Sequence, residues 1–152
     1  MTEAEAREIV SWRYEAPLDV YGRGMDGEEE AVAELVEPGN LYLAVTDEDD
    51  NLIAYLCYGE KARAGGIEYS GDALDVFGAA RPDLVGTGFG EMFVRAAVDF
   101  GTMFFRPGVL RASVGAFNER AIRVCEKAGF ERAGGFGDGG SDVVILTRSV
   151  EL

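Results

Sequence analysis

A strand, a glycine-rich turn, a long helix and a second strand follow one another between residues 73 and 117, and this succession restricts the fold most strongly. The run ALDVFGAA is apolar and β-prone, and GTGFG leads into FGEMFVRAAVDFGTMFF, where Met92, Ala96 and Phe100 recur at helical spacing. VLRASVGAF is again strand-like. Because a helix crosses between them, we expect the two strands to lie parallel in one sheet.

The flanking segments add helices and antiparallel strands to this unit. Asn118 is a typical N-cap and Gly129 a typical helix stop, and DEDDN reads as a hairpin turn. The remaining elements are expected at residues 1–14 and 28–37 (helices), 41–47 and 51–60 (strands), 118–129 (helix), and 130–136 and 141–150 (strands around GGFGDGG). The 152 residues fit one domain of ordinary size, so we expect a single mixed α/β domain over residues 1–152.

The composition excludes several kinds of chemistry. The chain has no histidine, which removes every mechanism with a histidine base, and its 2 cysteines predict neither a disulfide framework nor a metal site. The net charge of −14 should repel nucleic acid and anionic membranes. It leaves two interpretations open, a generally acidic surface or attraction of a cationic amine. With neither a signal-like start nor a membrane-length apolar run, the free cysteines favour the cytoplasm.

The glycine-rich turn has the features of a phosphate-binding loop. Gly86, Gly88 and Gly90 carry no Cβ, so the backbone can approach a ligand closely, and the first N–H groups of the next helix lack internal partners. Thr87 offers a further hydroxyl. The turn lacks the Lys-Ser/Thr pair of a P-loop and the acidic partner of a dinucleotide fold. By itself it predicts either a phosphate cradle or a packing turn.

Two linked motifs together resemble those of the GNAT acetyltransferases. VGTGFG, residues 85–90, resembles the acyl-CoA motif Arg/Gln-x-x-Gly-x-Gly/Ala. NERAIRVCEKAGF, residues 118–130, resembles the second motif, Asn-x-x-Ala in a helix that ends in Gly-Phe. The motifs cover residues 74–135, and the N-terminal half matches in layout. The resemblance implies a mixed sheet of about six to seven strands, about four flanking helices and a splay between the two central parallel strands.

The resemblance further implies acetyl-CoA as the acyl donor, bound without a metal in the gap between the parallel strands. The backbone of Gly78, Ala79 and Ala80 would bond the pantetheine, and Asn118 would contact the cofactor while capping its helix. The pyrophosphate would be held by the backbone of Val85, Gly86, Thr87, Gly88, Phe89, Gly90 and Glu91. Arg120 and Arg123 would either approach the phosphates or lie on a solvated helix face.

The residues of acyl transfer are less constrained. Asp75 lies in an otherwise apolar strand, where it could act as a desolvated base with a raised pKa or bond the neighbouring strand. Glu60 and Glu68 are further candidates for the base. Cys125 stands where many family members carry the tyrosine that protonates the departing thiolate, so it could replace that acid or only pack in the core. Water or a nearby tyrosine, such as Tyr14, Tyr21 or Tyr69, is the alternative acid. A backbone N–H near Ala79 would stabilise the oxyanion.

Trp12, Tyr14 and Tyr21 are concentrated before the second helix, where aromatic rings could bind a cationic substrate or seal a helix against the sheet. The resemblance implies an N-acetyltransferase that moves acetyl from acetyl-CoA to a primary amine, on a small molecule or a peptide N-terminus, in a ternary complex. The departures at Val85 and Cys125 leave a non-catalytic acyl-CoA sensor as the alternative. A homodimer is one oligomeric state that the resemblance implies.

Overall fold

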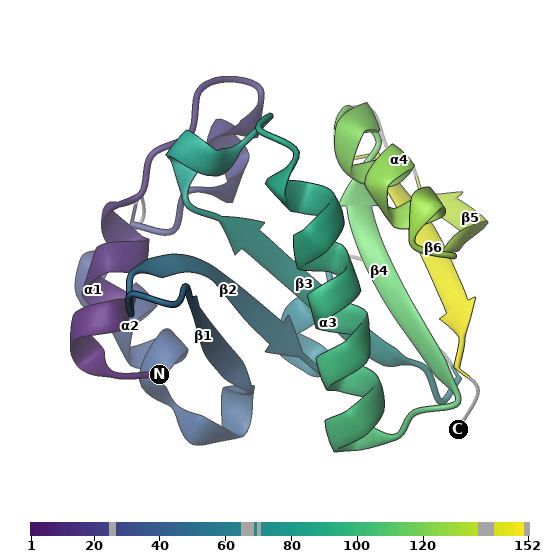
Figure 1. Ribbon diagram of the computed structural model, residues 1–152, viewed down its shortest axis with the longest axis horizontal. Coiled ribbons are helices and arrows are strands. Elements are labelled where there is room, and N and C mark those ends of the chain that lie inside the picture. Colours follow the sequence, from purple (N-terminus) through teal and green to yellow (C-terminus); the bar gives the residue numbers. More distant parts are fainter. Residues whose placement is uncertain (25–26, 65–68, 70, 137–141, 151–152) are drawn as a thin grey trace.

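The computed structural model describes residues 1–24, 27–64, 69, 71–136 and 142–150, and in these ranges it has a single six-stranded mixed sheet (Figure 1). The strands are β1 (Tyr42–Thr46), β2 (Leu52–Tyr58), β3 (Leu74–Ala80), β4 (Val109–Gly115), β5 (Glu131–Phe136) and β6 (Val143–Ser149). Their order across the sheet is β1-β2-β3-β4-β6-β5. The pair β3 and β4 is parallel, as the crossing helix predicts, and the other neighbours are antiparallel.

Four α-helices in the described part cover the two faces of the sheet. These are α1 (Glu3–Ser11), α2 (Glu28–Val36), α3 (Phe89–Phe105) and α4 (Glu119–Lys127). Figure 1 shows α3 and α4 on one face, with α1 and α2 on the opposite face. One buried cluster joins α1 and α2 to β1 and β2, and another joins α3 and α4 to β4 and β6. The expected class, a mixed α/β fold with about four flanking helices, is confirmed.

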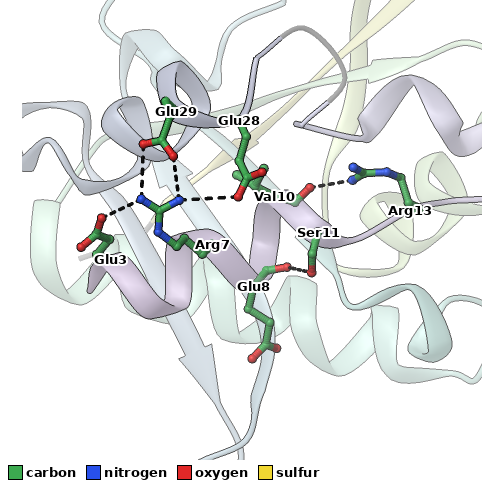
Figure 2. A network of polar contacts seen from close by, with 8 residues as sticks. All are labelled: Glu3, Arg7, Glu8, Val10, Ser11, Arg13, Glu28 and Glu29. Carbon is green, nitrogen blue, oxygen red and sulfur yellow. Dashed lines mark hydrogen bonds and ion pairs between the residues drawn. The ribbon is translucent and has the colours of Figure 1, made fainter.

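The first helix is held to its neighbour by a charged contact at the surface. Thr2 and Glu5 form the capping box that their spacing indicates, with Thr2 Oγ1 accepting from the Glu5 N–H at 3.1 Å. Arg7 on α1 donates to Glu29 on α2 at 3.0 Å and to Glu3 on its own helix at 2.8 Å (Figure 2). The two helices therefore pack side by side as one layer over β1 and β2.

Some boundaries differ from the sequence-based expectation. Helix α1 ends at Ser11, before the expected residue 14, because Trp12 has extended backbone angles and turns its ring into the core. Residues 18–21 form a 3₁₀ turn inside the expected loop. The last part of the expected glycine-rich turn and the first residue of the expected strand 141–150 (residues 137–141 together) lie outside the described residues.

The parallel strands separate soon after they meet. Residues 74–76 of β3 pair with residues 110–112 of β4, although β3 continues to Ala80 and β4 to Gly115. Beyond Val76 and Ala112 the two strands are no longer hydrogen-bonded to each other. The expected splay is therefore present, and it opens the sheet at the carboxyl ends of both strands.

Candidate active site

A cavity of about 460 Å³ occupies the gap between β3 and β4 and reaches both faces of the sheet. From the side of α3 and α4 it is lined by the glycine-rich turn, Val98 and Cys125. From the opposite side it is lined by Tyr14 and Phe77, which pack against the cluster of α1 and α2. A ligand that enters beside α3 can therefore meet a second ligand that enters from the face of α1.

The predicted cofactor-binding residues converge on this cavity. The lining includes Gly78, Ala79, Ala80, Val85, Gly86, Gly88, Phe89, Gly90, Glu91 and Asn118. Thr87 alone of the predicted set lies outside the lining, and its hydroxyl donates to the Leu84 carbonyl at 2.7 Å. This hydrogen bond closes the turn, and a contact from the Thr87 hydroxyl to a ligand remains a prediction.

The glycine-rich turn presents the start of α3 to the cavity. Gly86 and Gly88 have φ values of +79° and +89°, which glycine adopts without strain. Gly88 is the N-cap residue and has no side chain to satisfy the first N–H groups of the helix. These N–H groups lie at the positive end of a 17-residue helix, which suits a phosphate group.

A guanidinium group lies directly against this turn. A Cβ on Gly86 would come within 3.0 Å of Nη1 of Arg120, and both Arg120 and Lys127 line the cavity. Arg123 instead lies outside the lining, 3.9 Å from Glu119 on an exposed surface. The sequence left open which of the two arginines approaches the phosphates. Of the two, only Arg120 lies beside the turn, where it could meet a phosphate.

The backbone of β3 offers a free edge to an extended ligand. Gly78, Ala79 and Ala80 pair with β2 on one side, and β4 has already diverged on the other. Peptide groups on such an edge can bond to an added strand-like chain. Gly78 is required here, since a Cβ would lie 2.9 Å from the Tyr55 carbonyl oxygen and 2.6 Å from Cζ of Phe93.

Asn118 connects the start of α4 with the opposite wall of the cavity. Its Oδ1 accepts from the Ala121 N–H at 3.3 Å, which makes it the predicted N-cap. Its Nδ2 donates to the Tyr21 hydroxyl at 3.4 Å. The Asn118 side chain therefore ties α4 to the segment that precedes α2.

Cys125 lines the cavity from the second turn of α4, with its side chain buried. Burial raises the pKa of its thiol to about 11, because the charged thiolate is disfavoured away from water. The group is a protonated thiol at neutral pH. It can act as a hydrogen-bond or proton donor, whereas a thiolate nucleophile would need a lower pKa.

Asp75 lies beside the gap but outside the cavity lining. The side chain is 2% exposed, and Arg111 of β4 holds both carboxylate oxygens, with Nε–Oδ1 and Nη2–Oδ2 distances of 2.7 and 2.8 Å. Nε of Arg63 adds a third contact at 2.8 Å. Hydrogen bonding to Asp75 raises the pKa of Arg111 above its ordinary value. Asp75 therefore bonds the neighbouring strand, which is the second of the two predicted roles. Its carboxylate does not line the cavity, so the geometry does not support the role of base.

The aromatic residues before α2 divide between the core and the cavity. Trp12 is buried with its ring centroid 6.3 Å from that of Tyr55, and it lies outside the lining. Tyr14 lines the cavity and donates to the Ala80 carbonyl at 2.6 Å. Tyr21 also lines it, with ring centroids 6.1 Å from Phe77 and 6.0 Å from Phe117. The segment thus spans the gap from the end of β3 to the start of α4.

Several lining residues carry no signal in the sequence. Leu18 and Phe77 are ordinary apolar residues until the fold sets them beside Tyr21. Ser113 lines the cavity, and its Oγ lies 2.7 Å from the hydroxyl of Tyr69. Glu60 is exposed at the start of a 3₁₀ turn outside the lining, and Glu68 lies outside the described residues.

Two kinds of feature are absent from the described ranges. None of the helices there is long and apolar enough to cross a lipid bilayer. No cluster of three or more histidine, cysteine, aspartate or glutamate side chains there is placed to bind a metal ion. The expected absence of a metal remains a prediction.

Similar proteins were found by structure. No protein-family model matches the chain, and no curated protein sequence matches it either. A chimera of the spermidine N-acetyltransferase SpeG from Vibrio cholerae and hSSAT aligns with a TM-score of 0.77 and 18% identity over 98% of this chain and 92% of its own.

Two other solved structures align in the same way. AAC(6')-Ib in complex with ribostamycin and coenzyme A has a TM-score of 0.74 and 20% identity, over 98% of this chain and 90% of its own. A GNAT-family acetyltransferase from Bacillus anthracis has a TM-score of 0.70 and 17% identity, over 97% and 88%. Because these alignments cover 97–98% of this chain at TM-scores of 0.70 to 0.77, this chain has the fold of the GNAT acetyltransferases.

Proposed function

We propose that this protein is an acetyl-CoA-dependent N-acetyltransferase that transfers an acetyl group to a primary amine in a ternary complex. One observation carries the proposal. A single cavity joins a glycine-rich helix start, with a guanidinium group beside it, to the free edge of β3 and to Tyr14 and Phe77 on the other face of the sheet. A long anionic donor and an amine can enter this cavity from opposite sides.

The donor would be bound by three parts of the chain. The N–H groups at the start of α3, together with Arg120, would hold the pyrophosphate. The backbone of residues 78–80 would bond the pantetheine as an added strand. Asn118 borders the same cavity and would contact the cofactor from the start of α4.

Acyl transfer then requires little more than placement. The neutral amine nitrogen attacks the thioester carbonyl carbon, a C–N bond forms, the C–S bond breaks, and the acetyl group passes to nitrogen. A backbone N–H of β3 near Ala79 would donate to the developing oxyanion. Cys125 would donate a proton to the departing thiolate and regain one from water.

The amine proton needs a separate route. Glu91 is the single carboxylate among the described lining residues, and it lies in the first turn of α3 with the phosphate-binding groups. Asp75 is held by two arginines. We therefore propose that water accepts the proton, so that no side chain serves as the base.

The lack of a side-chain base placed among the described residues keeps a second function open. A protein that binds acetyl-CoA and offers no side-chain base in the described lining could act as a non-catalytic acyl-CoA sensor. The two functions share the donor site and differ in whether an amine releases free CoA.

Calorimetry with acetyl-CoA and an assay of CoA thiol release across a panel of primary amines would test these proposals. The transferase predicts micromolar binding and amine-dependent release of thiol. Binding without release for any amine would support the sensor instead. Failure to bind acetyl-CoA at high micromolar concentration would contradict both functions.

A further inference from the structure

We infer that the acceptor is a primary amine carried on an uncharged apolar body, aromatic or aliphatic, rather than a polyamine or a polycationic sugar. The inference deepens the proposed function and rests on it. It follows from the way in which charge is distributed along the cavity that joins the two faces of the sheet.

The charged groups of the cavity are gathered on one side. Glu91, Arg120 and Lys127 are the charged residues among its described lining, and all three belong to α3 or α4. Arg120 touches the glycine-rich turn at Gly86. This side suits the anionic end of the donor, and its net positive charge disfavours a polycation.

Among the described residues, the opposite side is lined by neutral and mostly apolar side chains. Tyr14, Leu18 and Tyr21 come from the segment after α1, and Phe77 comes from β3. The Phe77 ring lies between those of Tyr21 and Tyr55, with centroid distances of 6.1 and 6.3 Å. A wall of packed rings of this kind favours an apolar ligand surface over a hydrated one.

The hydroxyl groups of Tyr14, Tyr21 and Ser113 in the cavity lining already have partners within the protein. Tyr14 donates its proton to Ala80 at 2.6 Å, and burial raises the pKa of its phenol, so the group stays neutral. Tyr21 accepts a hydrogen bond from Asn118, and Ser113 is bonded to Tyr69. Such groups can orient one amine, but they supply no negative charge to balance further ammonium groups.

The number of amino groups in the acceptor then decides its affinity. A monoamine can lose its proton before attack and enter as a neutral molecule. A polyamine would carry its other ammonium groups into a wall of tyrosine, leucine and phenylalanine, and buried charges without partners are strongly disfavoured. The overall charge of −14 attracts every cationic amine from solution, so this field does not discriminate among them.

The similarity in fold does not identify the acceptor of this chain. Among the similar structures, one is named for spermidine and another contains ribostamycin, and both molecules carry several amino groups. Their identity to this chain is 18% and 20%, so the side chains that meet the acceptor are free to differ.

The experiment compares 2-phenylethylamine with spermidine at saturating acetyl-CoA, with thiol release as the measure of turnover. We expect kcat/KM for 2-phenylethylamine to exceed that for spermidine by at least about tenfold. Calorimetric titration of 2-phenylethylamine into the protein loaded with CoA should show binding, and titration of spermidine under the same conditions should show none.

A matched pair of substitutions locates the preference in the wall. Leu18→Glu places a carboxylate among the rings, and Leu18→Gln has nearly the same size without the charge. The glutamate variant should raise the ratio of spermidine to 2-phenylethylamine turnover about tenfold relative to the glutamine variant. An equal change in both variants would contradict the inference.

The outcomes separate this inference from the proposed function. A preference of the unmodified protein for spermidine or an aminoglycoside would overturn the inference and leave the transferase in place. Binding of 2-phenylethylamine without acetyl transfer would overturn the transferase and retain the class of ligand. Absence of 2-phenylethylamine binding would overturn the inference whatever the fate of acetyl-CoA.

Discussion

At the scale of single residues, burial decides what Cys125 can do. The sequence allows a proton donor or a packing residue, and the structure places the thiol in the cavity lining with its pKa raised to about 11. A thiol in this state keeps its proton throughout the neutral range. Cys57 is buried as well, and its pKa is also raised to about 11, so neither cysteine is set up as a nucleophile.

The pH dependence of alkylation tests this state of Cys125. The thiolate is the reactive form, so modification by iodoacetamide should rise with pH to a midpoint near 11. At pH 8 its rate should be about 100-fold lower than that of a thiol with a pKa two units lower. Peptide mass spectrometry reads Cys125 and Cys57 separately. A midpoint near 9 for Cys125 would show that the thiol is exposed to water.

The two arginines of α4 provide a matched test of the phosphate site. Arg120→Gln should weaken acetyl-CoA binding about tenfold, because a charge-assisted hydrogen bond to a phosphate is lost. Arg123→Gln removes the same charge from an exposed position outside the cavity and should change affinity less than about twofold. Calorimetry measures both. Equal losses would mean that only the net charge matters.

Asp75 should contribute to stability rather than to proton transfer. Asp75→Asn leaves the buried Arg111 guanidinium without its carboxylate, which should lower the free energy of unfolding by about 3 kcal/mol. Urea denaturation measures this loss. The pH profile of kcat/KM in the folded variant should keep its shape, since the carboxylate has no contact with the cavity. Loss of one titrating step from that profile would restore Asp75 as the base.

At the scale of elements, β3 packs so closely against α3 and β2 at Gly78 that there is no room for a side chain beside the β3–β4 gap. A Cβ on Gly78 would collide with the Tyr55 backbone, so Gly78→Ala should destabilise the protein by about 1–3 kcal/mol. Gly108→Ala is the control, because nothing lies within 4 Å of its added Cβ, and it should change stability by less than about 0.5 kcal/mol. Thermal denaturation compares the two. A Gly78→Ala variant as stable as the control would mean that β3 can shift away from β2.

At the scale of the whole molecule, the acidic surface should speed the encounter with a cationic amine. Raising the salt from 20 to 300 mM screens a field that extends about 10 Å at 0.1 M, so kcat/KM for a protonated alkylamine should fall several-fold. An aromatic amine that is neutral at the assay pH, such as aniline, is the control and should respond little. Equal responses would show that salt acts on the protein or on the donor. The homodimer and the cytoplasmic location remain predictions.

Much of the fold could be predicted because it depends on local chemistry. The N-cap at Asn118 appears where the sequence predicts it, and the helix between two apolar strands fixes β3 and β4 as parallel. The hairpin turn DEDDN likewise places β1 beside β2. The order of the remaining strands was not predicted. It depends on which faces pack together, and apolar strands of similar composition do not specify their neighbours.

The site divides in the same way. The sequence by itself determined the glycine-rich turn that starts α3, because glycines before an amphipathic helix dictate the local backbone whatever the rest of the chain does. Only the tertiary structure decided which side chains surround it. Arg120 was separated from Arg123, Asp75 was paired with Arg111, and Leu18 and Phe77 joined the cavity, because each outcome depends on contacts between segments far apart in the chain. Periodicity and spacing in the sequence indicate local structure, such as a helix, a strand or a turn. They do not indicate which segments far apart in the chain will be in contact.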